Sequence, residues 1–122
     1  MPATVTWHPD YDDVLLMTIS GSITMDEAFA VTVEESKLVE SAGRKVHTII
    51  DLREVQGVPS GFLQSLPRLT QLPAVVHPNA GKKIVVGARG MAETMLRIFS
   101  NVYRRLHMVS TMEEAERILR EE

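Results

Sequence analysis

The fold is decided by residues 46–51, which read VHTIID. Val46, Ile49 and Ile50 make this run apolar and β-branched, and charged residues flank it on both sides. Such a run is too short for a helix and too apolar for the edge of a sheet. We therefore expect a buried central strand here, with Asp51 at its carboxyl end.

Two earlier runs are typical of strands and predict an antiparallel hairpin. The first contains Val5 and Trp7, and the second spans residues 14–19. The turn-forming sequence HPDYDD, residues 8–13, separates them. The sheet is thus expected to open with two paired strands.

A helix is expected between the hairpin and the central strand. Thr24 precedes Glu27 by three residues, which is the spacing of a capping box. The sequence SAG at residues 41–43 supplies a glycine stop. The apolar residues between these points are loosely helical in spacing, and we expect Glu35 and Lys37 to lie on other faces of the helix.

Beyond the central strand, leucine recurs every three residues between positions 63 and 72. Pro67 and Pro73 would interrupt a regular helix, so we expect a short, broken one. Residues 83–86 then predict another buried strand, which Gly87 ends.

The C-terminal part of the chain predicts a helix, a short strand over residues 108–110 and a closing helix. The apolar positions of the first helix are Met95, Ile98, Phe99, Val102 and Leu106. Their spacing indicates an amphipathic helix. Thr111 and Glu114 form a second capping box, where the closing helix should begin.

The resulting order is ββαβαβαβα, which predicts an α/β fold. Right-handed crossovers between strands imply a mostly parallel sheet, to which the N-terminal hairpin adds an antiparallel edge. A chain of 122 residues has the length of one domain, so we expect residues 1–122 to form a single domain.

The composition excludes several classes of function. A net charge of −3 leaves no basic surface for nucleic acid. The chain has no cysteine, which excludes disulfides, thiolate nucleophiles and cysteine metal sites. No leader and no run long enough to span a membrane is visible, and we expect a cytoplasmic protein.

The segment at residues 49–61, IIDLREVQGVPSG, resembles the STAS family, also called the SpoIIAA-like fold. In anti-sigma-factor antagonists of that family, a strand ends in Asp-Leu and a phosphorylated serine follows about eight residues later. The resemblance assigns that position to Ser60, although Pro59 stands in place of the usual aspartate and Phe62 in place of a small residue. It implies a regulatory domain whose partner is a protein such as an anti-sigma-type kinase.

Ser60, Asp51 and Arg53 are the candidate phosphorylation or partner site. Ser60 has two interpretations: an N-cap of the following helix, which is the commoner use of serine, or a regulated phosphosite. Asp51 and Arg53 either form a polar binding patch or reflect an aspartate that caps its own turn, again the commoner case.

Gly87, Arg89 and Gly90 are a candidate anion or ligand contact, because they lie between a strand and a helix as phosphate-binding turns do. The sequence lacks the glycine spacing of dinucleotide sites and the lysine of a P-loop, which favours a plain turn. The histidines are scattered, and no serine has a nucleophile-elbow motif. We therefore expect no metal, no cofactor and no catalytic residues.

Two functions remain, and dimerisation is compatible with both. The first is a non-catalytic interaction module that resembles an anti-sigma-factor antagonist. The alternative is a small-molecule or lipid-binding domain of the same fold, because the leucine- and methionine-rich segments either fill the core or line an apolar groove. A homodimer would pack apolar side chains such as Leu66, Leu69, Phe99 or Tyr103 across its twofold axis.

Overall fold

The computed structural model describes residues 2–101 and 103–121, which form a five-stranded sheet in the order β1-β2-β3-β4-β5. β1 (Ala3–Trp7) pairs antiparallel with β2 (Val14–Gly21). β3 (Val46–Val55), β4 (Ala80–Val86) and β5 (Leu106–Val109) continue the sheet in parallel. The predicted α/β class, strand directions and order are confirmed.

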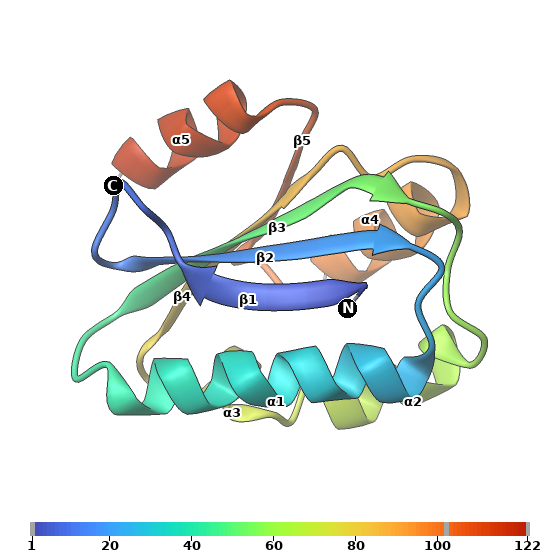
Figure 1. Cartoon of the computed structure of the whole chain (residues 1–122), viewed down its shortest axis with the longest axis horizontal. Helices are drawn as coiled ribbons and strands as arrows, with labels where there is room; N and C mark the ends of the chain where they lie inside the picture. The colour runs from blue at the N-terminus through green and yellow to red at the C-terminus, as the bar shows by residue number, and fades with distance from the viewer. Residues whose placement is uncertain (1, 102, 122) are drawn as a thin grey trace.

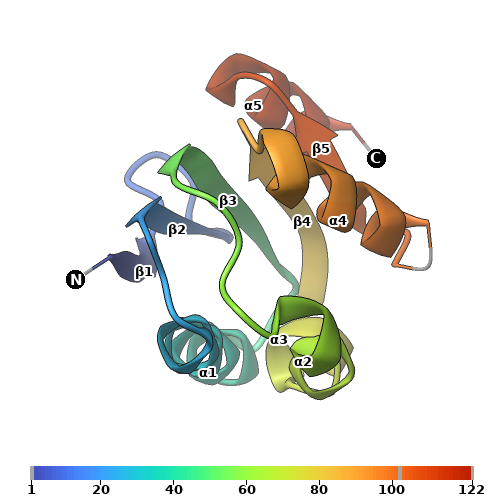
Figure 2. The same ribbon diagram turned by 90° about the vertical axis from the view of Figure 1, so that its right-hand side faces the viewer.

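The helices cover the sheet on two sides (Figures 1 and 2). α1 (Met25–Ser41), α2 (Phe62–Leu69), α3 (Pro73–Val76) and α4 (Gly90–Ser100) lie on one face. α5 (Met112–Arg120) packs on the opposite face. The broken helix predicted from the prolines is thus two short helices: Pro67 lies inside α2, and Pro73 begins α3.

Alternation along each strand divides the core between the two faces. On the α1 side, Leu15 and Met17 of β2 pack against Val31 and Val39 of α1. On the α5 side, a second cluster is built by Val14, Ile49, Ile84, Val86 and Ala115. Trp7 ends the edge strand and is 40% exposed, outside both clusters.

The first helix begins and ends where the sequence predicts. The Thr24 hydroxyl accepts a hydrogen bond from the amide of Glu27 at 3.1 Å, and the Glu27 carboxylate accepts one from the Thr24 amide at 2.9 Å. This reciprocal pair completes the capping box. α1 ends at Ser41, and Gly43 follows in the left-handed region with a φ of +70°, at the predicted glycine stop.

β3 is longer than predicted. It continues past Asp51 to Val55, because the end of β2 keeps pairing with it, up to Gly21 opposite Val55. Asp51 is nevertheless the last residue of β3 that pairs with β4, opposite Val86. The side chain therefore lies at the carboxyl edge of the β3–β4 pair but not at the end of its own strand.

The end of the predicted amphipathic helix was wrong. α4 stops at Ser100, and Leu106 is the first residue of β5, where it pairs with Lys83. Leu106 is buried in the same cluster as Leu96 and Phe99, which explains why its spacing imitates a helical position. Val102, also assigned to this helix, lies outside the described residues.

The closing helix begins at the second predicted cap, with one difference. The Thr111 hydroxyl accepts a hydrogen bond from the Glu114 amide at 3.2 Å, but the Glu114 carboxylate accepts one from the amide of Ser110, one residue earlier. Within the described residues, no helix is long and apolar enough to cross a membrane.

Candidate functional site

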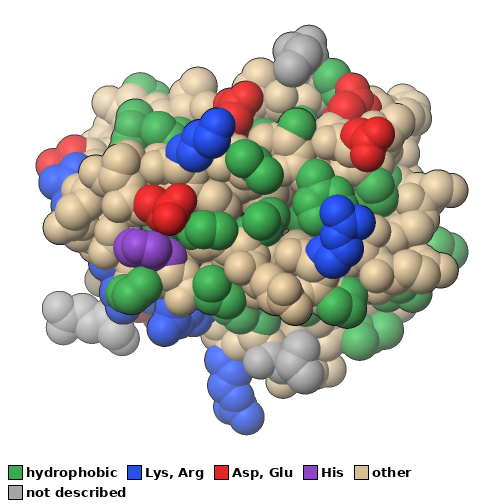
Figure 3. Space-filling model, turned by 90° about the horizontal axis from the view of Figure 1, so that it is seen from below, with side chains coloured by type: hydrophobic (Ala, Val, Ile, Leu, Met, Phe, Trp, Pro, Cys, Tyr) green, Lys and Arg blue, Asp and Glu red, His purple; other side chains and the backbone are tan. Residues whose placement is uncertain are grey.

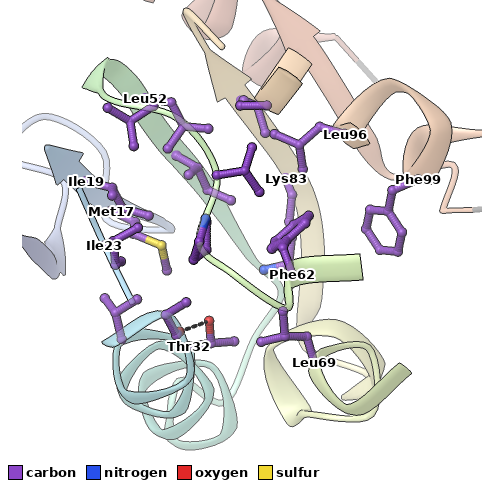
Figure 4. Close-up of a pocket in the computed structure, with 18 of the residues that line it drawn as sticks. Met17, Ile19, Ile23, Thr32, Leu52, Phe62, Leu69, Lys83, Leu96 and Phe99 are labelled. Atoms are coloured by element: carbon purple, nitrogen blue, oxygen red, sulfur yellow. Dashed lines mark hydrogen bonds between the residues drawn. The ribbon is translucent and has the colours of Figure 1, made fainter. Parts of the chain in front are cut away.

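An apolar pocket of about 190 Å³ lies on the face of the sheet that carries α1 and α4. Figure 4 shows side chains from the sheet, α1, α2 and α4 converging on it. Its apolar lining includes Met17, Ile50, Leu52 and Val85 from the sheet, Val31 from α1, and Leu96 and Phe99 from α4. Val75 of α3 also lines it, so the sheet and four helices build one hollow.

α2 covers this pocket without packing into the core. Phe62, Leu66 and Leu69 line the pocket on one side of the helix, whereas Leu63 on the other side is half exposed. None of the eight residues of α2 is buried, although the helix is strongly amphipathic. A face this apolar normally reaches core contacts. Here it faces the pocket.

The lining of the pocket includes an ion pair. The ammonium group of Lys83, on β4, contacts Oε2 of Glu35, on α1, and the Thr48 hydroxyl donates to the same oxygen at 2.7 Å. Glu35 is 2% exposed and Lys83 is 7% exposed. Charged side chains are rarely buried so fully unless they are paired, and this pair belongs to the pocket lining.

Sequence reasoning missed this pair. The expectation that Glu35 lies on another face of its helix than the apolar residues was wrong, because Glu35 is spaced four residues from both Val31 and Val39 and shares their buried face. The same periodicity was present in the sequence. Lys83 alternates with buried Ile84 and points to the pocket side of β4.

The two threonine hydroxyls in the lining donate hydrogen bonds to nearby backbone carbonyl oxygens. Thr32 donates to the carbonyl oxygen of Ala28 at 2.7 Å, a bond drawn in Figure 4. Thr70 donates to the carbonyl oxygen of Pro67 at 3.1 Å. The charged groups of Glu35 and Lys83 are thus the distinctive polar feature of the pocket.

Asp51 and Arg53 form a two-pronged ion pair. Nε and Nη2 of Arg53 donate to the two carboxylate oxygens of Asp51 at 3.0 and 2.9 Å. The Arg53 amide also donates to Asp51, at 3.1 Å. These bonds, the side-chain ones foremost, hold the pKa of Asp51 below its ordinary value. The aspartate thus engages Arg53 on its own strand, and no turn follows it, while Arg53 remains exposed. A polar binding patch at Asp51 and Arg53 stays a prediction.

Ser60 is exposed on the loop between β3 and α2. The interpretation of Ser60 as an N-cap was wrong: the N-cap of α2 is Gly61, in the left-handed conformation at φ +80°, and α2 has no side-chain cap. Glycine adopts this conformation without steric cost, so the chain turns one residue later than expected. A phosphosite at Ser60 stays a prediction.

Arg53, Gly87 and Arg89 meet in a second, polar depression of about 420 Å³. Arg89 donates to the carbonyl oxygen of Arg53 at 3.3 Å. A side chain at Gly87 would overlap Arg53, since its Cβ would lie 2.4 Å from the Arg53 Cγ. Gly90 is the first residue of α4 beside this depression. The predicted anion contact and the Asp51–Arg53 pair are therefore neighbours, whereas Ser60 lines neither hollow.

The charges around the polar depression largely cancel. Arg53 is paired with Asp51, and Arg97 is paired with Glu93 at 2.8 Å. Exposed pairs of this kind attract a further anion weakly. Anion binding at Gly87, Arg89 and Gly90 stays a prediction. Among residues 2–101 and 103–121, no group of three His, Asp or Glu side chains could hold a metal ion.

The apolar residues predicted for a dimer interface lie at or next to the apolar pocket, and a homodimer stays a prediction. Leu66, Leu69 and Phe99 line the apolar pocket, and Tyr103 stacks on Phe99 with 5.6 Å between the ring centres. The face of the molecule that carries α1, seen in Figure 3, shows small apolar patches separated by charged side chains.

Comparison with known proteins identifies the fold. No family model matches the chain, and no curated protein does. Bacillus SpoIIAA in its phosphorylated form superposes with a TM-score of 0.64 at 14% identity, over 96% of this chain and 100% of SpoIIAA. An anti-sigma factor antagonist from Mycobacterium paratuberculosis gives 0.63 at 24% identity, over 98% and 93%. An uncharacterised DUF3478 protein from Shewanella loihica gives 0.61 at 15%, over 96% and 91%. The predicted SpoIIAA-like fold is confirmed.

Proposed function

We propose that the chain is a non-catalytic regulatory module that binds a protein partner, in the manner of an anti-sigma-factor antagonist. The observation that carries the proposal is the likeness to such antagonists over nearly the whole length of both chains. A fold hosts many functions, so the surface must supply the rest of the argument.

The proposed contact surface is the loop at residues 56–61 together with the outer side of α2. Ser60 is exposed there, and the exposed half of Leu63 offers an apolar contact beside it. The exposure of Ser60 supports access by a kinase. One of the structural neighbours is a phosphorylated SpoIIAA, which supports phosphorylation as the form of regulation.

A phosphate on Ser60 would act through α2. It would add about two negative charges directly before the helix, where free amide groups and the helix dipole favour an anion. The Phe62 amide donates to the carbonyl oxygen of Pro59 at 3.2 Å. Because α2 has no side-chain cap of its own, the next amides, of Leu63 and Gln64, are available to the phosphate. The new charge would also repel an acidic partner or attract a basic one.

The test is phosphotransfer and binding with a purified kinase-type anti-sigma factor from the same genome. We expect the kinase to label Ser60, and Ser60→Asp to weaken the complex at least about tenfold, or about 1.4 kcal/mol. Ser60→Ala should bind without being labelled. Ser41→Asp is the control, because Ser41 is an exposed serine at the far end of α1.

Three results would count against this function. Labelling that persists in Ser60→Ala would exclude Ser60 as the phosphosite. Equal binding by wild type, Ser60→Asp and Ser41→Asp would remove the switch, and failure of every such kinase to bind would remove the antagonist role.

A second candidate function is the binding of an apolar small molecule, and the pocket beneath α2 favours it. The pocket offers an apolar lining and one buried polar group, as ligand sites do. Native mass spectrometry of the freshly purified chain should detect a bound molecule. Bare protein, together with an unchanged melting temperature across a ligand panel, would argue against this function.

A further inference from the structure

The ion pair in the pocket limits the chemistry of any occupant. Glu35 and Lys83 carry opposite charges in direct contact, so the charged part of the pocket lining has no net charge. A charged ligand would lose its hydration in an apolar hollow without finding a counter-charge of its own. That loss is costly unless the charge is paired.

The pair nevertheless has unused hydrogen-bonding capacity. Oε2 of Glu35 accepts from both Lys83 and Thr48, whereas Oε1 accepts no hydrogen bond from the described residues. The ammonium group of Lys83 has three N–H donors and directs one of them to Glu35. One free acceptor and free donors therefore lie side by side in the pocket lining.

The volume of the pocket sets the size of the apolar part. A cavity of about 150 Å³ lined by Leu, Ile and Phe binds benzene. The pocket here measures about 190 Å³ and has a comparable apolar lining, with Phe62 and Phe99 at its edge (Figure 4). One ring or a short alkyl chain with one small polar group fills such a space.

We propose that the pocket binds a neutral amphiphile, an alcohol or a primary amide with a single ring or short chain. Its O–H or N–H donates to Oε1 of Glu35, and its oxygen accepts from the Lys83 ammonium group. This inference rests on the second candidate function, ligand binding in the pocket.

Four probes of nearly equal size test whether the pocket prefers a neutral polar ligand to an apolar or a charged one. They are benzyl alcohol, toluene, benzoate and benzylammonium. Binding is followed at pH 7 by titration of amide chemical shifts. We expect benzyl alcohol to bind at least about tenfold tighter than benzoate or benzylammonium, because only the charged probes must bury a net charge. Toluene should bind more weakly than benzyl alcohol, since it leaves the free donor and acceptor unmatched.

Two substitutions on α2 test whether benzyl alcohol binds in the apolar pocket. Leu66→Trp puts a large side chain into the pocket and should abolish binding of benzyl alcohol. Leu63→Trp enlarges the exposed side of the same helix and should leave it unchanged. Equal binding by both variants would overturn the assignment to this pocket.

The double variant Glu35→Leu/Lys83→Met tests whether the ion pair recognises the polar group of the ligand. It replaces the pair by apolar side chains of similar volume and should reverse the preference, so that toluene binds at least as tightly as benzyl alcohol. A preference for benzyl alcohol that survives the replacement would overturn the role of the pair.

The outcomes distinguish failure of the neutral-ligand inference from failure of ligand binding in the pocket. If benzoate or benzylammonium binds as tightly as benzyl alcohol, the neutral-ligand inference fails while ligand binding stands. If none of the four probes binds at millimolar concentration, ligand binding in the pocket fails, and the inference fails with it.

Discussion

At the scale of single residues, the buried contact between Glu35 and Lys83 is the least expected feature of the molecule. Both side chains lie among apolar residues of α1 and β4, and Thr48 adds a hydrogen bond to the carboxylate. Taking two charges out of water often costs as much free energy as their attraction returns. Stability alone therefore gives little reason for the pair, which favours a role in binding.

Removing one partner of this pair should destabilise the chain far more than removing both. Lys83→Met leaves the carboxylate of Glu35 buried without a counter-charge and should lower the free energy of unfolding by about 3–5 kcal/mol. The double variant Glu35→Leu/Lys83→Met should stay within about 1 kcal/mol of wild type, or exceed it. Urea unfolding followed by circular dichroism measures both.

A comparable loss in the single and double variants would contradict this account. It would mean that Lys83 contributes through the packing of its alkyl chain and not through its charge.

Residue-scale prediction from the sequence succeeded for the cap at Thr24, whereas the equally local cap at Ser60 was wrong. The Thr24 cap depends on a side chain and an amide three residues apart, and the structure contains it. Glu35 depends on which face of α1 meets the sheet, and Lys83 comes from a strand that follows almost fifty positions later. Such a pairing is fixed by tertiary packing, which no local pattern contains.

At the scale of elements, α1 and α2 differ in what holds them. α1 has a complete capping box and buries Val31, Glu35, Ser36 and Val39. α2 begins at a left-handed glycine without a side-chain cap, contains Pro67 and buries no residue. We infer that α2 is the more weakly held of the two.

The cap of α1 is directly measurable. Thr24→Ala removes the acceptor for the Glu27 amide and should lower the free energy of unfolding by about 1 kcal/mol. Ser22→Ala, two residues earlier at another exposed position, serves as the matched control and should change it by less than about 0.5 kcal/mol. Equal losses in the two variants would show that the capping box adds nothing.

Element boundaries were harder to predict than element types. All five strands and the principal helices follow from periodicity, but β3 exceeds its apolar run because β2 continues to pair with it. Leu106 was predicted in a helix but lies in β5, since a buried leucine fits either pattern. Both errors arise because pairing between strands is a long-range property.

At the scale of the whole molecule, the sheet separates a tightly filled side from a hollow one. On the α5 side, Val14, Ile49 and Ile84 are at most 1% exposed and pack around Ala115. On the α1 side, the space between the sheet, α2 and α4 is the apolar pocket. In this molecule, one face of the sheet is thus filled by packing, and the other contains the apolar pocket.

Hydrogen exchange should reveal this asymmetry. The amides of β3 and β4 lie between two layers and should exchange most slowly, near the rate set by global unfolding. The amides of α2 should exchange at least about tenfold faster than those of α1 between Val31 and Val39, because α2 buries no residue. Native-state exchange measured by NMR or mass spectrometry compares them, and equal protection of α1 and α2 would contradict the loose attachment of α2.

The position of Trp7 determines which part of the molecule its fluorescence emission reports on. It is the only tryptophan of the chain, it ends the edge strand opposite Leu15, and it does not line the pocket. Its emission therefore monitors detachment of the N-terminal hairpin and is insensitive to a guest beneath α2. If emission and far-ultraviolet ellipticity give different transition midpoints, the hairpin and the parallel strands come apart in separate steps.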